Sequence, residues 1–178
     1  MRLSGRRLTG DKMNKTRWVV LGGGILLAVI PACAVLLTSK LLAQRLTPSE
    51  IPWTQSVANR PGSGMEPGLD TVYVAGDGTK HELYSIVFKI PAHASIQPHS
   101  HPDDRSCFVL SGTWYFAYGL KRDESKFKVL PPGSSYTEPA NMIHFAGTKA
   151  EAATLECTAV GPTGTIFVNP VEDPRNKK

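Results

Sequence analysis

Hydrophobic and polar residues alternate in short runs from about residue 70 to residue 168. In 81–90, for example, Tyr84, Ile86 and Phe88 fall on one side of an extended chain, with polar Ser85 and Lys89 on the other. Gly and Pro separate the runs, and no helical period appears. The predicted strands are 71–75, 81–90, 105–111, 113–118, 126–130, 134–138, 142–147, 153–160 and 165–168. This pattern predicts an all-β sandwich or barrel.

The N-terminal part has a different pattern. Residues 18–38 form an apolar run of 21 positions without a charge. A helix of that length spans roughly 30 Å, the thickness of a membrane core. Six basic residues precede the run, which by the positive-inside rule predicts a cytoplasmic N-terminus and a barrel on the periplasmic or extracellular side. A cleaved signal peptide, releasing the barrel to the periplasm, and a lipoprotein site at Cys33 are the alternatives.

Together these patterns divide the chain into five parts. A Pro- and Gly-rich stretch separates the apolar segment from the strands, and the last residues are polar. The predicted parts are a basic cytoplasmic N-terminus (1–17), a transmembrane or signal-anchor helix (18–40), a linker (41–68), a β-barrel (69–170) and a polar tail (171–178).

The charge distribution along the chain bears on whether the predicted barrel binds nucleic acid. Residues 1–45 carry 8 basic and 1 acidic residue, whereas residues 46–178 carry 12 basic and 14 acidic residues. The basic character therefore belongs to the N-terminal segment, and the barrel gives no electrostatic reason to expect nucleic acid.

Cys107 and Cys157 are the only cysteines after Cys33. A disulfide and two free thiols are both compatible with their spacing.

Histidines provide the candidate chemistry. His99 and His101 are two residues apart, so on an extended strand their side chains point to the same side. Two neutral imidazoles side by side can bind one divalent metal ion. Zinc, iron, manganese, nickel and copper are all candidates for that ion.

The order of these residues resembles the two motif blocks of the cupin superfamily. The first block reads His-X-His, three or four residues, an acid, six residues and Gly, which places its Gly at Gly112. The second reads Gly, five residues, Pro-X-Gly, two residues and His, which here runs from Gly133 through Pro139 to His144. Asn141 replaces the second Gly of that block and tolerates a positive φ.

The resemblance covers residues 70–170 and implies a cupin-type jelly-roll barrel with a metal or small ligand inside. His99, His101 and His144 would be the metal ligands. The C-terminal sequence 161–175 also resembles a group of small exported single-domain cupins of unassigned activity.

The chain also departs from the cupin pattern at the acidic ligand of the first block, and this departure affects the metal site. The acidic ligand of the first block would fall on residue 105, which is Arg105. A guanidinium cannot bind a metal ion. Four outcomes follow: three histidines with water, a substitute carboxylate, a different role for Arg105 in pairing with a carboxylate or binding an anionic substrate, or a cavity without metal. The candidate carboxylates are Asp103, Asp104, Glu138 and Glu156.

The aromatic run 114–118 adds a candidate for substrate binding, Tyr115, although core packing is the ordinary role of such residues. The sequence thus predicts an exported, membrane-anchored barrel that binds a divalent metal, a small polar molecule or both, either as a metal-dependent enzyme or as a non-catalytic binding or sensory module without metal. A homodimer formed through exposed strands is a further expectation.

Overall fold

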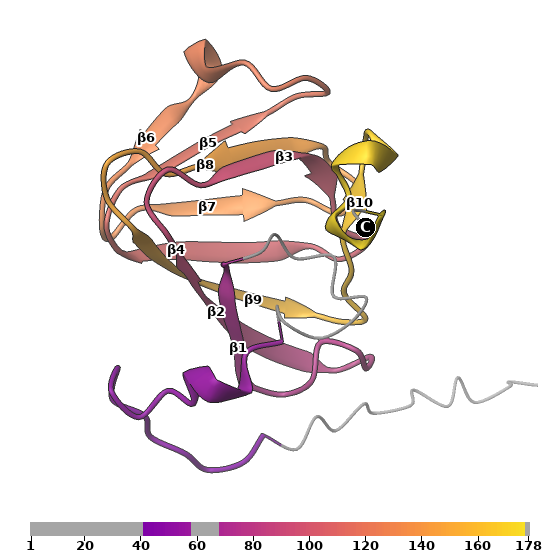
Figure 1. Cartoon of the computed structure of the whole chain (residues 1–178). Helices are drawn as coiled ribbons and strands as arrows, with labels where there is room; N and C mark the ends of the chain where they lie inside the picture. The colour runs from indigo at the N-terminus through magenta and orange to yellow at the C-terminus, as the bar shows by residue number, and fades with distance from the viewer. Residues whose placement is uncertain (1–40, 58–67, 177–178) are drawn as a thin grey trace, which may run out of the picture. The chain divides into compact units, whose positions relative to one another are not determined.

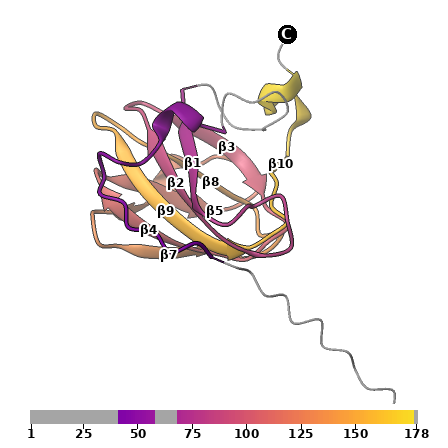
Figure 2. The ribbon, with the colours of Figure 1, turned by 90° about the horizontal axis from the view of Figure 1, so that it is seen from below.

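The structure, a computed structural model, describes residues 41–57 and 68–176, and its strands form two antiparallel sheets (Figures 1 and 2). The first sheet has the order β1 (Asp70–Ala75), β2 (Leu83–Ile90), β9 (Ala153–Val160), β4 (Arg105–Ser111) and β7 (Ser135–Glu138). The second has the order β10 (Ile166–Phe167), β3 (Ser95–Ser100), β8 (His144–Gly147), β5 (Trp114–Tyr118) and β6 (Lys128–Leu130). Figure 1 shows the sheets as two facing layers, so the predicted all-β fold is confirmed.

Alternation along the strands creates the core between the sheets. On β4, Arg105, Cys107 and Val109 are buried, whereas Ser106 and Phe108 between them are exposed. The same period of two runs along β9. Because successive side chains of a strand point to opposite faces, β4 and β9 each present alternate residues to the interior.

One strand was missing from the predicted set. β3 carries His99 and contains Pro98, which has no N–H to donate to a neighbouring strand. Its pairing with β8 is irregular between Ile96 and His99, and Pro98 lies in this interruption. Proline within a sheet is tolerated at bulges of this kind, which explains why a strand forms where the sequence pattern did not indicate one.

Two turns contain the positive-φ positions of the motif blocks. Gly112 has a φ of +70° between β4 and β5, and a Cβ there would lie 2.0 Å from the carbonyl oxygen of Ala152. Asn141, before β8, has a φ of +62°. The expectation that Asn141 replaces a glycine in the left-handed region is confirmed.

A disulfide joins the central strand of the first sheet, β9, to its neighbour β4. Cys107 on β4 and Cys157 on β9 are direct partners in the register and are bonded to each other. Both side chains are buried. Of the two alternatives that the sequence left open, the structure contains the disulfide.

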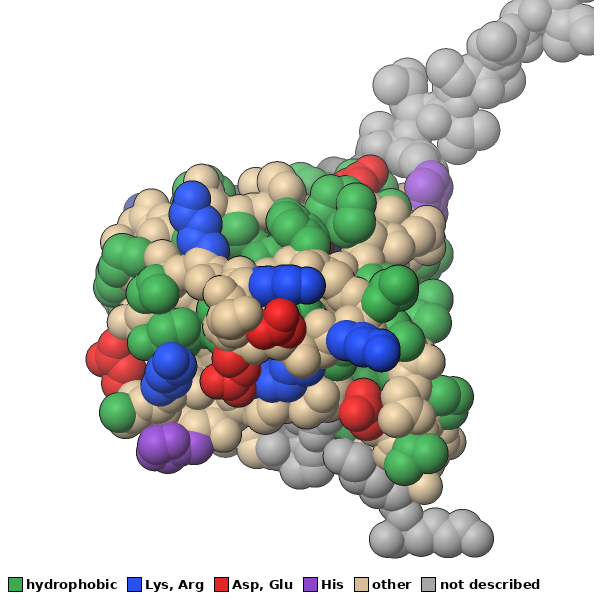
Figure 3. Space-filling view, turned by 90° about the horizontal axis from the view of Figure 1, so that it is seen from above, with side chains coloured by type: hydrophobic (Ala, Val, Ile, Leu, Met, Phe, Trp, Pro, Cys, Tyr) green, Lys and Arg blue, Asp and Glu red, His purple; other side chains and the backbone are tan. Residues whose placement is uncertain are grey.

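The remaining described residues form short turns and extended segments. In the predicted linker, a 3-10 turn, η1 (Trp53–Gln55), precedes Val57, whose N–H donates to the carbonyl of Thr71 on β1 at 2.7 Å. Further 3-10 turns are η2 (Glu124–Lys126), η3 (Pro170–Glu172) and η4 (Pro174–Asn176). On the face shown in Figure 3, basic and acidic side chains are interspersed rather than gathered by sign.

Within 41–57 and 68–176, no helix has the length and apolar character needed to cross a membrane. The predicted helix over 18–40 and the basic segment 1–17 lie outside the described residues.

Candidate metal centre

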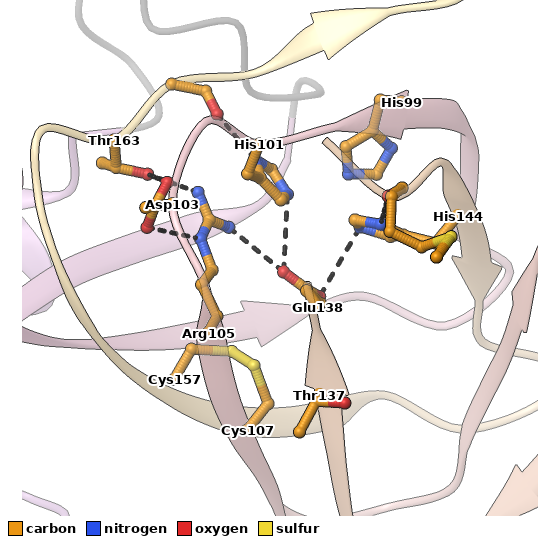
Figure 4. Close-up of polar contacts among 12 residues, drawn as sticks. His99, His101, Asp103, Arg105, Cys107, Thr137, Glu138, His144, Cys157 and Thr163 are labelled. Carbon is orange, nitrogen blue, oxygen red and sulfur yellow. Dashed lines mark hydrogen bonds and ion pairs between the residues drawn. A yellow bond between two sulfur atoms is a disulfide. The ribbon is translucent and has the colours of Figure 1, made fainter. Parts of the chain in front are cut away.

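The three histidines of the motif blocks converge inside the barrel (Figure 4). His99 is the penultimate residue of β3 and His144 is the first residue of β8, and the two are direct partners in the register of these strands. His101 follows β3, with its ring centroid 4.8 Å from that of His99 and 5.2 Å from that of His144. One ring nitrogen of each histidine lies within 4.8 Å of the other two. All three residues are buried.

Backbone carbonyls fix the tautomer of each ring. The Nδ1 atoms of His99, His101 and His144 lie 2.7, 2.6 and 3.0 Å from the carbonyl oxygens of Gln97, Gly164 and Met142, respectively. A carbonyl oxygen only accepts hydrogen bonds, so each Nδ1 carries the proton and each Nε2 keeps a free lone pair. Metal-binding histidines are commonly oriented by such a bond from their other nitrogen.

The environment keeps the imidazoles of His99 and His101 neutral. Burial, followed by the proximity of His144, lowers the pKa of His99 to about 3. Burial, followed by the charge of Arg105, lowers the pKa of His101 well below its ordinary value. Neutral imidazole is the form that binds metal ions. The Nε2 atom of His144 is buried and has no hydrogen-bond partner among the described residues.

Glu138 brings a carboxylate to the same point. It ends β7 on the opposite sheet, is buried, and directs its oxygens between two of the rings (Figure 4). Its Oε2 lies 3.5 Å from Nε2 of His101, and its Oε1 lies 3.6 Å from Nε2 of His144. Of the four carboxylates proposed from sequence, Glu138 is the one that faces the imidazoles in this way.

The other three carboxylates have different partners. Asp104 is exposed and accepts a hydrogen bond from the N–H of Ala140 at 2.8 Å. Glu156 accepts one from the hydroxyl of Ser85. Asp103 is buried and contacts Arg105.

Arg105 points into the barrel and binds carboxylates. It is the direct partner of Glu138 in the register of β4 and β7, and its Nη1 lies 3.3 Å from Oε2 of that residue. Its Nε donates to Asp103 at 3.2 Å, and its Nη2 donates to the hydroxyl of Thr163. Burial alone would lower the pKa of Arg105, but the charge of Glu138, with smaller contributions from Tyr84 and Asp103, raises it. Of the outcomes left open by sequence, Arg105 adopts the pairing with carboxylates.

Two residues of this network were not foreseen. The hydroxyl groups of Tyr84 and Thr163 both donate to Asp103, which therefore accepts hydrogen bonds from three side chains. Thr163 and the carbonyl of Gly164 belong to the segment that follows β9. Their sequence separation from Asp103 and His101, about sixty residues, gives no spacing signal that would reveal these contacts.

A cavity of about 80 Å³ opens beside these groups. His99, His101, Arg105, Glu138 and His144 all line it. Tyr115, proposed from sequence as a substrate-binding residue, is not among the lining residues. Its ring instead lies 6.1 Å from that of Phe127, with the ammonium group of Lys149 4.8 Å from its centroid.

Comparison with known proteins is informative at the level of fold. No family model and no curated protein matches the chain. Among solved structures, the polyketide cyclase RemF from Streptomyces resistomycificus has a TM-score of 0.56 at 16% identity, covering 75% of this chain and 91% of the cyclase.

Two further solved structures have lower TM-scores than RemF. The DMSP lyase DddQ from Ruegeria pomeroyi has a TM-score of 0.49 at 22% identity, with 70% of this chain and 60% of the lyase covered, so the chain spans less than two thirds of that protein. A cupin 2 conserved barrel domain protein from Leptotrichia buccalis has a TM-score of 0.44 at 21% identity, with 54% and 42% covered. At 16% identity the likeness to RemF shows the fold alone, a barrel of two antiparallel sheets such as the sequence predicted.

Proposed function

We propose that this protein binds one divalent metal ion inside its barrel through His99, His101, His144 and Glu138, and that it acts on a small molecule bound there. The observation that carries the proposal is the convergence of three imidazoles whose Nδ1 atoms are all tied to carbonyls. Three nitrogen ligands and one carboxylate suit zinc and the other first-row ions.

A cavity without metal is less favourable for the same residues. The Nε2 atom of His144 would then stay buried without a hydrogen bond, at a cost of about 1–3 kcal/mol. When bound, a divalent ion supplies Lewis-acid polarisation of a ligand oxygen or of water. Arg105 holds the carboxylate of Glu138 in place through its contact at 3.3 Å. The metal-binding interpretation therefore gives the buried Nε2 atom of His144 a partner.

The proposal extends to the location of the protein. The uncharged segment 18–38 and the basic residues before it support a membrane anchor, with the barrel on the periplasmic or extracellular side. Protease protection in intact cells or spheroplasts tests this topology. A barrel that is digested only after the cytoplasm is opened would contradict it.

The metal content of the purified full chain tests the site. About one ion per chain is expected, and His144→Ala should lose it while the circular dichroism of the strands persists. His93→Asn is the matched control, because His93 is exposed and has a φ of +60°, which Asn tolerates. A native protein without metal, or the same metal content in His144→Ala, would refute the proposed site.

A further inference from the structure

The cavity has two chemically distinct parts. The polar groups around Glu138 form one, and apolar side chains form most of the rest of the lining. Leu69, Ile90, Trp114, Ala146 and Leu155 line the cavity and belong to one hydrophobic cluster of the core. Phe88 and Ile96 also line the cavity and pack against that cluster. A ligand that fills this space must therefore present hydrocarbon to most of the lining and polar atoms to the metal centre.

We infer that the ligand of this site is a small molecule with an apolar body and a single monoanionic, oxygen-chelating head, such as a 2-hydroxycarboxylate or an enolate. The inference rests on the proposed metal centre and specifies what that centre binds. The histidines and Glu138 supply four ligands, so a six-coordinate ion retains two positions, which two oxygens of one head group can fill.

The charges around the cavity favour one negative charge on the ligand. The described ionised side chains of the cluster are Arg105, Asp103 and Glu138, which sum to −1. A divalent ion changes the sum to +1, and a monoanionic head then brings it to zero. Because unpaired charge is costly in a buried apolar site, this balance selects against a dianion.

Arg105 is already occupied by protein groups and cannot compensate a second negative charge. Its three nitrogens contact Asp103, Glu138 and Thr163. Among the described residues that line the cavity, no lysine and no other arginine is present. A phosphate ester or a dicarboxylate would therefore enter with an uncompensated charge.

The apolar part of the lining also selects against sugars. Away from the metal centre, Thr165, Tyr136 and the indole N–H of Trp114 are the side-chain polar groups among the described lining residues. A polyol would lose hydrogen bonds to water that these few groups cannot replace, and each unsatisfied hydroxyl is costly when buried. The cavity of about 80 Å³ has room for several waters, at roughly 10–15 Å³ for each water, so the space suits a small organic molecule.

Four probes that share one head group test the inference. Mandelate, glycolate, gluconate and malate are all 2-hydroxycarboxylates, which differ only in a phenyl body, no body, a polyol body and a second carboxylate. Calorimetry on the full chain loaded with Co²⁺ should show mandelate binding at least about tenfold tighter than glycolate, because the phenyl body is buried against the apolar lining. Gluconate and malate should bind no tighter than glycolate. Tighter binding of gluconate or malate than of mandelate, or equal binding of mandelate and glycolate, would overturn the inference.

A substitution in the apolar lining gives an independent test. Ile96→Ser should reduce the mandelate-to-glycolate preference several-fold, because Ile96 belongs to the apolar lining of the cavity and is not one of the four proposed metal ligands. Ile166→Ser is the matched control, since Ile166 is exposed on β10 and does not line the cavity. An equal effect of both substitutions would contradict a role of this lining in recognition.

Metal content, measured before the probes are added, separates failure of the inference from failure of the proposed function. A chain that holds no ion refutes the metal centre. In that case benzyl alcohol and glycerol are titrated into the metal-free protein. Preferential binding of benzyl alcohol would still support the apolar body, whereas binding of neither compound, or of glycerol alone, would overturn it.

Discussion

The two sheets of the barrel contribute unlike halves of the candidate site. The second sheet contributes the imidazole wall, which consists of His99 on β3, His144 on β8 and His101 directly after β3. The first sheet contributes the carboxylate wall, Arg105 on β4 and Glu138 on β7. Backbone carbonyls orient the side chains of the imidazole wall, whereas the two side chains of the carboxylate wall orient each other.

This difference predicts how each wall responds to substitution. His99 and His144 are oriented by carbonyls two residues away in their own segments, so they keep their positions when a distant side chain changes, whereas His101 relies on the carbonyl of Gly164 after β9. Glu138 depends on a charged neighbour, so substitutions on β4 reach it through Arg105. The imidazole wall should therefore determine whether a metal ion binds, and the carboxylate wall should adjust how tightly it binds.

The largest effect is expected from the imidazole wall. The double substitution His99→Ala/His101→Ala removes two of the four proposed ligands. Structural metal sites supply about 10–16 kcal/mol, so loss of two ligands should weaken binding by at least about 10³-fold. Competition with a chromogenic chelator measures this affinity. A smaller loss than that caused by Glu138→Gln would reverse the assignment of the two walls.

The disulfide behind the carboxylate wall should contribute stability rather than affinity. Cys107 and Cys157 link β4 to β9 and close a loop with a sequence separation of 50. Cys107→Ala/Cys157→Ala should lower the free energy of unfolding of the barrel by about 2–4 kcal/mol. Denaturant titration of both proteins measures the change, and metal content should stay near that of the native chain. Unchanged stability would show that the crosslink does not support the first sheet.

Exchanging the charges of the carboxylate wall tests the position of the acid. Glu138→Gln replaces a proposed carboxylate ligand with a neutral amide, so it should weaken metal binding by at least about 10–100-fold, the loss found when groups that only support metal ligands are removed. Arg105→Glu/Glu138→Arg moves the carboxylate to β4, to the direct partner position across the two strands, and keeps the charge balance. The exchanged protein should recover affinity to within about tenfold of the native chain. Weaker binding in the exchanged protein than in Glu138→Gln would show that only β7 can supply the carboxylate.

The sequence predicted the imidazole wall better than the carboxylate wall for a physical reason. His99 and His101 share a face because of a period of two within one segment, and the spacing of Gly133, Pro139 and His144 fits a second block. Local spacing was sufficient there. The choice among four carboxylates needed the register of β4 against β7, which depends on long-range pairing that residue spacing does not encode.

The fold was predictable to a similar degree. Alternation and Gly or Pro breaks identified most strands, while β3 was missed because Pro98 interrupts its pattern at a bulge. The disulfide needed the direct pairing of Cys107 with Cys157 across two strands. The helix over 18–40 and the exported location stay predictions, since the described residues begin at Leu41.

The smallest effect on metal affinity is expected at Asp103, which contacts Arg105. This buried carboxylate accepts hydrogen bonds from Tyr84 and Thr163 and holds Arg105 through Nε at 3.2 Å. Asp103→Asn keeps the size of the side chain but removes its charge. Arg105 is then less firmly oriented, and Glu138 loses part of its support. Metal affinity should fall by about two- to tenfold, less than for direct loss of the Glu138 carboxylate.

Asp104→Asn is the matched control for that substitution, because Asp104 is adjacent in sequence but exposed and directed to the N–H of Ala140. Chelator competition gives the affinity, and denaturant titration shows whether the barrel has merely become less stable. If Asp103 acts through Arg105, its effect on affinity should disappear in an Arg105→Gln background, where the guanidinium is absent. An undiminished effect in that background would mean that Asp103 acts directly on the segment of Thr163, to which it is hydrogen-bonded, and not through Arg105.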